Sequence, residues 1–194
     1  MRIIAGTFRS RTLQAPAGLA TRPSSDRLRE TLFNVLAPRI EGARFLDLYA
    51  GSGAVGIEAL SRGAAEVVFV ERAAAAIRVL RANLDRLQVT EGFRIDTGSA
   101  GGFLRKGAAG RQFDLVFLDP PYDAAEEYTT TLGLLGGSAR GLLAGGASVI
   151  AEHRRKERLE NEYGGLRRTR LLEQGDAALS FYAQANMVTD ERDG

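Results

Sequence analysis

The sequence predicts an α/β fold in which a mostly parallel sheet is covered by helices on both faces. Short apolar runs alternate with helix-like segments along most of the chain, as in sheets whose strands are buried on both sides. Turns rich in glycine or proline directly follow two of these runs. The 194 residues suffice for one domain with its own core, and the apolar and charged fractions of 44% and 26% are those of a globular protein.

The first forty residues precede this alternation and are expected to form an arm and a helix. The opening stretch alternates apolar and polar residues around Gly6, which predicts a β-hairpin or an extended arm. Apolar residues then recur at helical spacing from Arg27 to Leu36, and the available N-cap residues are Ser24, Ser25 and Asp26.

Seven strands and their connecting helices follow. The strands are expected over residues 45–49, 66–70, 93–95, 113–118, 147–151, 166–172 and 178–182. Helices are expected through 57–60, over 73–87 and around 126–135. This gives a main domain over residues 41–186, with a flexible tail at 187–194. In such sheets ligands bind at the carboxyl ends of the strands, so the residues after strands one, two and four are the ones to inspect.

A glycine-rich turn follows the first strand. Gly51, Gly53 and Gly56 fit the nucleotide-binding pattern G-x-G-x-x-G, and Glu71 ends the second strand twenty positions after Gly51. Glycines let a ligand approach the backbone, and an acid at the position of Glu71 can accept hydrogen bonds from ribose hydroxyls. Several nucleotide-type ligands use this geometry. A tight turn without a ligand is the bland alternative.

Asp47 helps to distinguish which nucleotide-type ligand the turn binds. It lies near the carboxyl end of the first strand, where a pyrophosphate would gain nothing from another negative charge. S-adenosylmethionine carries an ammonium and a sulfonium group, and a carboxylate suits both. The alternative is that Asp47 caps a helix or forms an ion pair.

The most specific motif is Asp119-Pro120-Pro121-Tyr122, directly after the fourth strand. Two prolines stiffen the backbone and remove two N–H donors. The Asp119 carboxylate and the Pro120 carbonyl then become fixed acceptors, as an exocyclic amino group requires, and Tyr122 offers a ring for base stacking. A plain proline-rich loop is the alternative. The motif predicts methyl transfer from S-adenosylmethionine to an amino group of a nucleic-acid base by direct displacement.

The composition narrows the chemistry further. The chain has no cysteine, which excludes disulfides, cysteine-ligated zinc and the cysteine-dependent route to C5-methylcytosine; no metal is expected. His153, in the charged run 152–158, reads as a solvated surface residue in a solvated loop rather than as a catalyst.

A basic arm points to a polyanionic partner. Residues 1–44 hold eight arginines against three acidic residues, a net charge of +5, whereas the whole chain carries only +2. The codon bias of a GC-rich genome would favour Arg over Lys but would not place the surplus at one end. Neither a signal peptide nor a membrane span is visible, so a cytoplasmic protein is expected.

The chain resembles the bacterial 16S ribosomal RNA guanine-N2 methyltransferases, the RsmD family, over essentially its whole length. The resemblance rests on five stretches, residues 2–6, 22–34, 46–53, 58–64 and 117–122. The Asp-Pro-Pro-Tyr element is shared by many amino methyltransferases, so the segment from Arg22 to Asn34 is what points to this family.

The resemblance implies a Rossmann-like seven-stranded methyltransferase fold, S-adenosylmethionine as donor, and a guanine N2 in the 16S RNA of an assembling small subunit as target, with a monomeric enzyme. Relatives usually carry an aspartate after strand three that contacts the adenine; here Ser99 stands there, with Asp96 nearby. The expected donor contacts are Asp47, Tyr49, Gly51, Ser52, Gly53, Gly56, Glu71, Arg72 and Ser99. The expected RNA contacts are Arg9, Arg11, Arg22 and Arg27.

Three other functions remain open. An NAD-dependent oxidoreductase would explain the glycine pattern and Glu71, but it lacks a second substrate domain and a reason for the proline motif. A DNA adenine-N6 or guanine-N2 methyltransferase would share the motif but would need a larger target-recognition insertion. A non-catalytic RNA-binding module on the same fold is the third.

Overall fold

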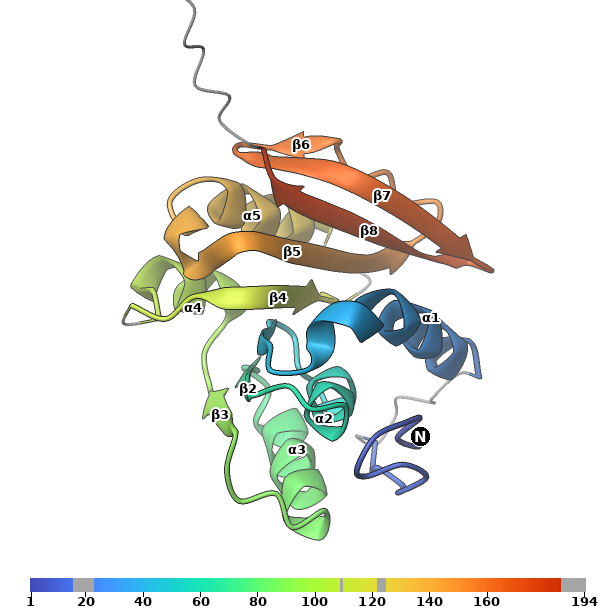
Figure 1. Ribbon diagram of the computed structural model, residues 1–194. Helices are drawn as coiled ribbons and strands as arrows, with labels where there is room; N and C mark the ends of the chain where they lie inside the picture. Colours follow the sequence, from blue (N-terminus) through green and yellow to red (C-terminus); the bar gives the residue numbers. More distant parts are fainter. Residues whose placement is uncertain (16–22, 109, 122–124, 186–194) are drawn as a thin grey trace, which may run out of the picture.

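One eight-stranded sheet forms the centre of the protein (Figure 1). The computed structural model describes residues 1–15, 23–108, 110–121 and 125–185, with the side chains of 23–25 excepted. The strands run in the order β3-β2-β1-β4-β5-β8-β7-β6. They are β1 (Arg44–Asp47), β2 (Glu66–Val70), β3 (Phe93–Asp96), β4 (Phe113–Leu118), β5 (Leu143–Arg154), β6 (Glu162–Tyr163), β7 (Leu166–Gln174) and β8 (Ala177–Gln184). The first five of that order pair in parallel and the last three are antiparallel, which confirms the mostly parallel sheet.

Helices cover both faces of the sheet, as the alternating pattern predicted (Figure 1). They are α1 (Pro23–Ile40), α2 (Ala54–Ser61), α3 (Ala74–Arg86), α4 (Ala100–Lys106), α5 (Ala125–Gly136) and the short 3-10 helix η1 (Arg140–Leu142). Buried residues of α1, α2 and α3 share one core with one face of the sheet, and those of α4 and α5 share a second core with the other face. In the described part of the chain no helix is both long and apolar enough to span a bilayer.

Helix α4, the 3-10 helix η1 and strand β6 were not predicted from the sequence, and helix α1 differs from its predicted bounds. Helix α1 is longer at both ends and begins at Pro23, so Ser24, Ser25 and Asp26 lie in its first turn and do not precede it as N-caps. Proline suits the first helical position because its fixed φ matches the helix and its missing N–H has no intrahelical partner there. The sheet also has an eighth strand, β6, which is two residues long and too short to leave a periodic pattern in the sequence.

The N-terminal arm is a hairpin packed against the domain. Arg2 and Thr12 form its isolated β-bridge, and Ile3 and Leu13 are buried in the core on the α1–α3 side. Backbone N–H groups of the hairpin donate to the side chains of Glu58 and Ser61 on α2. Of the two forms predicted, the hairpin is therefore the one present, and it does not extend away from the protein.

His153 corrects the prediction of a solvated residue. Strand β5 extends to Arg154, so His153 belongs to the sheet and only 3% of it is exposed. Its Nε2 lies 2.9 Å from the Ser180 hydroxyl and its Nδ1 lies 2.9 Å from the Arg154 carbonyl. Burial lowers the pKa of His153, which favours the neutral ring. The pairing of β5 with β8, distant in sequence, buries the beginning of the charged run.

Candidate active site

The glycine turn lies between β1 and α2, at the carboxyl edge of the sheet. Gly51 and Gly53 adopt positive φ angles of 54° and 82°, a conformation that favours glycine. No atom lies within 4 Å of where a Cβ on Gly51 would stand, whereas a Cβ on Gly56 would lie 2.2 Å from the Phe69 ring. Gly51 therefore leaves the backbone open to a ligand, and Gly56 lets α2 pack closely on β2.

Glu71 is held directly against this turn. It follows β2, and its carboxylate oxygens accept hydrogen bonds from the Gly51 N–H at 2.8 Å and from the Ala73 N–H at 2.7 Å. Each carboxylate oxygen can accept a second hydrogen bond. The open face of Gly51 and the fixed acceptors of Glu71 fit the ribose of a nucleoside-type donor.

Asp47 lies beneath the turn. It is 1% exposed, and its carboxylate accepts a hydrogen bond from the Gly56 N–H at 3.1 Å. Burial raises the pKa of Asp47 to about 7, against the opposing effect of that hydrogen bond, and nearby Asp119 and Glu71 raise it further. The geometry therefore corresponds to the helix-capping alternative, in which Asp47 binds a backbone N–H in the first turn of α2.

Tyr49 and Arg72 both meet α5 through Glu127. The Tyr49 hydroxyl donates to Glu127 at 2.9 Å and lies 2.7 Å from the Thr131 hydroxyl. An Arg72 guanidinium nitrogen lies 3.9 Å from Glu127, and the Arg72 side chain is 65% exposed. Burial raises the pKa of Tyr49 well above its usual value, so the hydroxyl stays protonated. These contacts tie the edge of the glycine turn to α5.

Ser52 and Ser99 both have structural partners. The Ser52 carbonyl accepts from buried Asn83, which also exchanges hydrogen bonds with the backbone of Gln14. Ser99 is the N-cap of α4, and its hydroxyl accepts a hydrogen bond from the Gly102 N–H at 3.1 Å.

Asp96 ends β3, and its carboxylate accepts a hydrogen bond from the Gly98 N–H at 2.9 Å. Asp96 therefore places a carboxylate at the end of β3, close in sequence to Ser99.

The proline motif follows β4 without an intervening residue. Asp119 is half-buried, Pro120 is buried and Pro121 is exposed. Burial raises the pKa of Asp119 to about 7. Strand β4 pairs with β1, which carries the glycine turn, so the motif and the turn open onto the same edge. Tyr122 lies outside the described residues.

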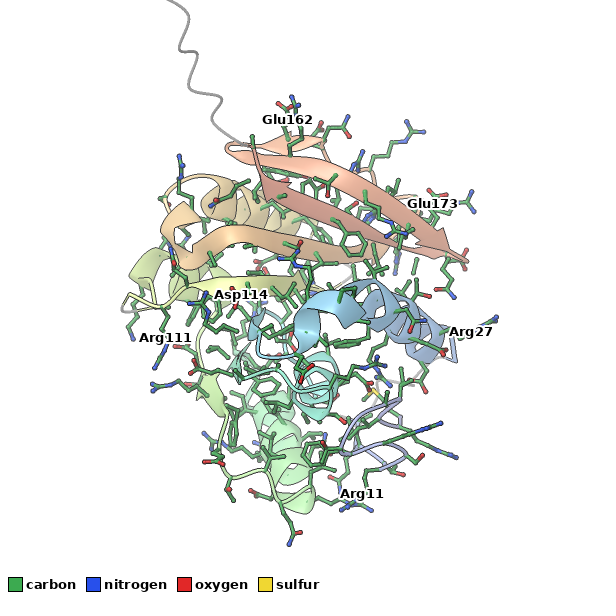
Figure 2. The ribbon with its side chains drawn as sticks, viewed as in Figure 1. Arg11, Arg27, Arg111, Asp114, Glu162 and Glu173 are labelled. Carbon is green, nitrogen blue, oxygen red and sulfur yellow. The ribbon has the colours of Figure 1, made fainter. Side chains whose placement is uncertain are left out.

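The cations expected to contact RNA lie on the hairpin and α1. Arg9, Arg11 and Arg27 are exposed, and Figure 2 shows Arg11 and Arg27 projecting outward on the side of the hairpin and α1. Arg11 also donates to the Arg86 carbonyl at the end of α3. Arg22 lies outside the described residues. The arm is less basic at its surface than the sequence indicates, because Arg29 is 5% exposed and lies 3.1 Å from Asp26.

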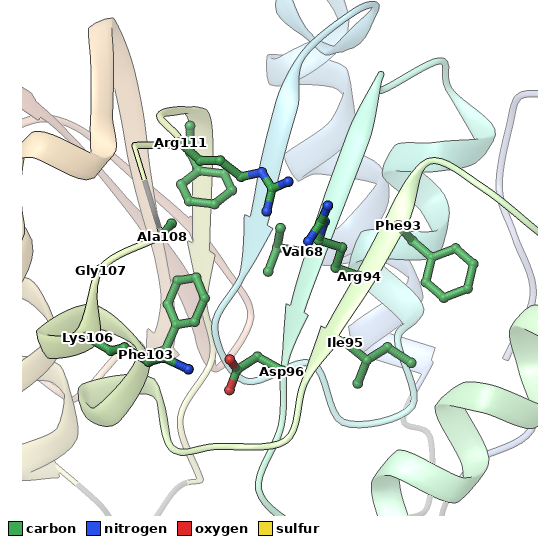
Figure 3. A pocket seen from close by; sticks show the side chains of 11 residues that line it. Val68, Phe93, Arg94, Ile95, Asp96, Phe103, Lys106, Gly107, Ala108 and Arg111 are labelled. Atoms are coloured by element: carbon green, nitrogen blue, oxygen red, sulfur yellow. The ribbon is translucent and has the colours of Figure 1, made fainter.

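A separate hollow of about 540 Å³ opens on the α4 face of the sheet (Figure 3). Arg94, Asp96 and Arg111 line it together with Phe103 of α4. Two of its cations are paired, since Arg94 and Arg111 lie 3.3 Å and 3.8 Å from Glu66. The residues of the glycine turn and the proline motif do not line the hollow. The hollow reaches the carboxyl edge of the sheet at Asp96, which ends β3.

The sequence reasoning missed Glu152 at this edge. Glu152 lies on β5, the strand next to β4, and the charge of Asp119 acts on it. Ligands bind at the carboxyl ends of parallel strands. The same rule, applied to the end of strand five, indicates Glu152 as a candidate site residue. The charged run 152–158 predicted a solvated loop at this position, whereas Glu152 belongs to β5.

Comparison with known proteins places the chain in a family. The model of the family described as conserved hypothetical protein 95 matches residues 1–183. "Putative rRNA methyltransferase YlbH" of Bacillus subtilis is 38% identical over 184 residues, which are 94% of this chain and 98% of that protein. "Ribosomal RNA small subunit methyltransferase D" of Escherichia coli is 44% identical over 122 residues, 63% of this chain and 60% of that protein.

A solved structure shares both fold and sequence with the chain. "Putative methyltransferase yhhF" from Escherichia coli superposes with a TM-score of 0.82 at 35% identity, covering 95% of this chain and 97% of that one. The methyltransferase fold implied by the sequence is thus confirmed. By its sequence and its fold, the chain belongs to the conserved hypothetical protein 95 family, which is the RsmD family indicated by its motifs.

Proposed function

We propose that this chain is an S-adenosylmethionine-dependent methyltransferase that modifies the exocyclic N2 of a guanine in small-subunit ribosomal RNA. The observation that carries the proposal is the placement of Asp119, Pro120 and Pro121 directly after a buried strand, at the edge where Glu71 is fixed against an open glycine turn. The names of the B. subtilis and E. coli relatives support ribosomal RNA as the substrate class. The guanine N2 rests on the sequence resemblance.

The donor, S-adenosylmethionine, supplies a methyl group on a cationic sulfur. Glu71 binds the ribose hydroxyls, and the turn at Gly51 and Gly53 lies against the donor. Asp96, at the end of β3, accepts a hydrogen bond from the adenine of the donor. Asp47 stays beneath the turn, where it holds the start of α2.

Asp119 and the Pro120 carbonyl act on the target amino group. Its nitrogen is conjugated with the base, so its lone pair is poorly available. Two fixed acceptors turn both N–H bonds away from the donor and leave the lone pair directed at the methyl group. The new C–N bond forms as the S–CH₃ bond breaks, its electron pair stays on sulfur, and Asp119 takes the proton released by the nitrogen. Tyr122 stacks on the base.

The RNA partner of the protein is 16S RNA in an assembling small ribosomal subunit. The protein binds this RNA as a monomer, in the cytoplasm. Residues 1–40 contribute RNA-facing and donor-facing groups, and residues 41–186 form the catalytic domain. The predicted tail at 187–194 lies outside the described residues. Phosphates contact Arg9, Arg11, Arg22 and Arg27. Three of these are exposed in the described part of the chain, as phosphate contacts must be.

Mapping the modified nucleotide tests the function. Small subunits from a strain lacking the gene would be incubated with enzyme and labelled donor, and the RNA digested and analysed by mass spectrometry. The proposal expects one N2-methylguanine in 16S RNA that is missing before treatment. Methyl incorporation into DNA instead would favour the DNA amino-methyltransferase. Binding of NAD without any methyl transfer would favour the oxidoreductase.

Replacing Glu71 with Ala should weaken donor binding by roughly 1–3 kcal/mol, the cost of leaving buried polar groups unpaired. Titration calorimetry with S-adenosylmethionine measures the change. The control is Glu91→Ala, an exposed acid beyond α3, which should bind the donor normally. Unchanged affinity in the Glu71 variant would remove this residue from the donor site.

Replacing Arg9 and Arg11 together with Ala should make RNA affinity less dependent on salt. Each lost phosphate contact lowers the logarithmic salt slope by about 0.7–0.9, whereas donor affinity should stay the same. Filter binding of small-subunit RNA across a range of salt concentrations gives the slope. A matched variant lacking Arg105 and Arg140, which are exposed on elements of the α4–α5 side, should keep it. An equal slope in both variants would make the hairpin purely structural.

A further inference from the structure

Glu152 lies beside the catalytic motif on the neighbouring strand. Leu118 of β4 pairs with Ala151 of β5, so the next residues, Asp119 and Glu152, are side by side. Phe117 and Ile150 both face the α1–α3 core. Because side chains alternate along a strand, Asp119 and Glu152 face the same side as these two residues. The two carboxylates thus form a pair that faces α1.

The backbone of Glu152 is hydrogen-bonded, whereas its carboxylate has no hydrogen-bond donor among the described residues. Its backbone carbonyl accepts a hydrogen bond from the Tyr128 hydroxyl at 2.7 Å. Among the residues that the structure describes, no group donates a hydrogen bond to its side chain. The residue is half-buried, so the carboxylate is partly withdrawn from water but open to a ligand at the edge of the sheet. An acid in this situation needs a donor that comes from elsewhere.

Arg29 of α1 provides a buried positive charge near this carboxylate. Arg29 is 5% exposed, and its Nε has no hydrogen-bond partner in the described part of the chain. Burial and Asp119 raise the pKa of Glu152 well above its usual value, and Arg29 opposes them. Glu152 therefore resists ionisation in the free protein, and a donor reaching its oxygens would stabilise the ionised form.

We propose that Glu152 accepts the N1–H of the target guanine, while Asp119 holds the adjacent amino group. This inference rests on the proposed function, and it makes Glu152 the residue that selects the base. Guanine presents two neighbouring donors, N1–H and the 2-amino group, on one edge, which two adjacent carboxylates can accept. Where Glu152 is ionised, a purine with an unprotonated N1 would place a lone pair against the carboxylate and would be disfavoured.

The test compares guanine with 2-aminopurine at the nucleotide mapped above, in small-subunit RNA assembled by ligation. 2-Aminopurine keeps the target amino group but carries a lone pair at N1. Wild type should methylate guanine faster. In Glu152→Gln, the amide can rotate its NH₂ toward that lone pair, so the guanine preference should shrink by roughly tenfold to a hundredfold. Glu173→Gln, an exposed acid on β7 paired with Arg155, is the matched control and should keep the wild-type preference.

A second variant keeps the test decisive if Glu152→Gln folds poorly. Glu152→Ala removes the acceptor, so its guanine rate should fall at least about tenfold, whereas its 2-aminopurine rate should be no lower than that of wild type. Thermal unfolding and donor titration establish that each variant is folded. An unchanged preference in a folded variant would overturn the role of Glu152. The mapping experiment tests the proposed function separately. If the proposed function were wrong, that experiment would find no N2-methylguanine in 16S RNA.

Discussion

Replacing Asp119 with Ala is expected to lower the single-turnover methylation rate by roughly a hundredfold or more, on the scale of removing one preorganised polar contact. The loss should fall on the rate and leave donor and RNA affinity nearly unchanged, because the alignment of the amino lone pair is complete only in the transition state. Rapid-quench measurement of methyl transfer to small subunits gives the rate. Asp176→Ala, an exposed acid in the turn between β7 and β8, is the control.

The pKa of Asp119 adds a pH signature to this prediction. The ionised form is the one that accepts an N–H and the released proton, and burial raises its pKa to about 7. The wild-type rate should therefore rise with pH up to about 7 and level off above it. Because the folded pKa is raised, ionisation of Asp119 destabilises the fold as pH rises above its unfolded value. The Ala variant should accordingly be no less stable than wild type at neutral pH.

Two results would contradict this role of Asp119. Near-full methylation by the Ala variant would show that the carboxylate is not needed for the reaction. A rate loss matched by an equal loss of unfolding free energy would show that Asp119 supports the fold and not the chemistry.

Replacing Glu58 with Ala is expected to lower the free energy of unfolding by about 3–5 kcal/mol, the typical cost of removing one partner from a buried ion pair. Glu58 on α2 is fully buried, and it accepts hydrogen bonds from the Ile4 and Ala5 N–H groups at 2.8 Å and 3.0 Å. Arg62 donates to it at 2.8 Å, and buried Arg29 lies 4.0 Å away. The variant leaves these donors unpaired and releases the N-terminal hairpin from α2.

Urea unfolding measures the loss, and limited trypsin digestion at Arg9 and Arg11 reports release of the hairpin. Glu66→Ala provides the comparison: Glu66 is partly exposed and lies 3.3 Å from Arg94 and 3.8 Å from Arg111. Exposed pairs of this kind contribute about 0–1 kcal/mol. A loss for Glu58→Ala no larger than that for Glu66→Ala would show that the hairpin is held by its apolar residues alone.

The sequence by itself determined the features that depend on residues close to one another in the chain. Apolar runs predicted the parallel strands, because a strand buried on both faces needs apolar side chains at every position. The glycine turn and Glu71 were placed together because the carboxyl ends of parallel strands meet at one edge. Asp119 was found because two prolines after a buried strand leave a local signature that no other part of the chain repeats.

Only the tertiary structure decided which charged residues are buried. Glu58 and Arg29 are charged residues on helices, yet they lie close to each other and to the hairpin backbone in the interior. His153 and Glu152 read as part of a solvated run, yet the pairing of β5 with β8 and β4 places one in the core and the other beside Asp119. A charged group can be buried only where partners satisfy it, and these partners lie far away in the chain, as the Ile4 N–H and Glu58 do, 54 positions apart. No local pattern encodes that distance.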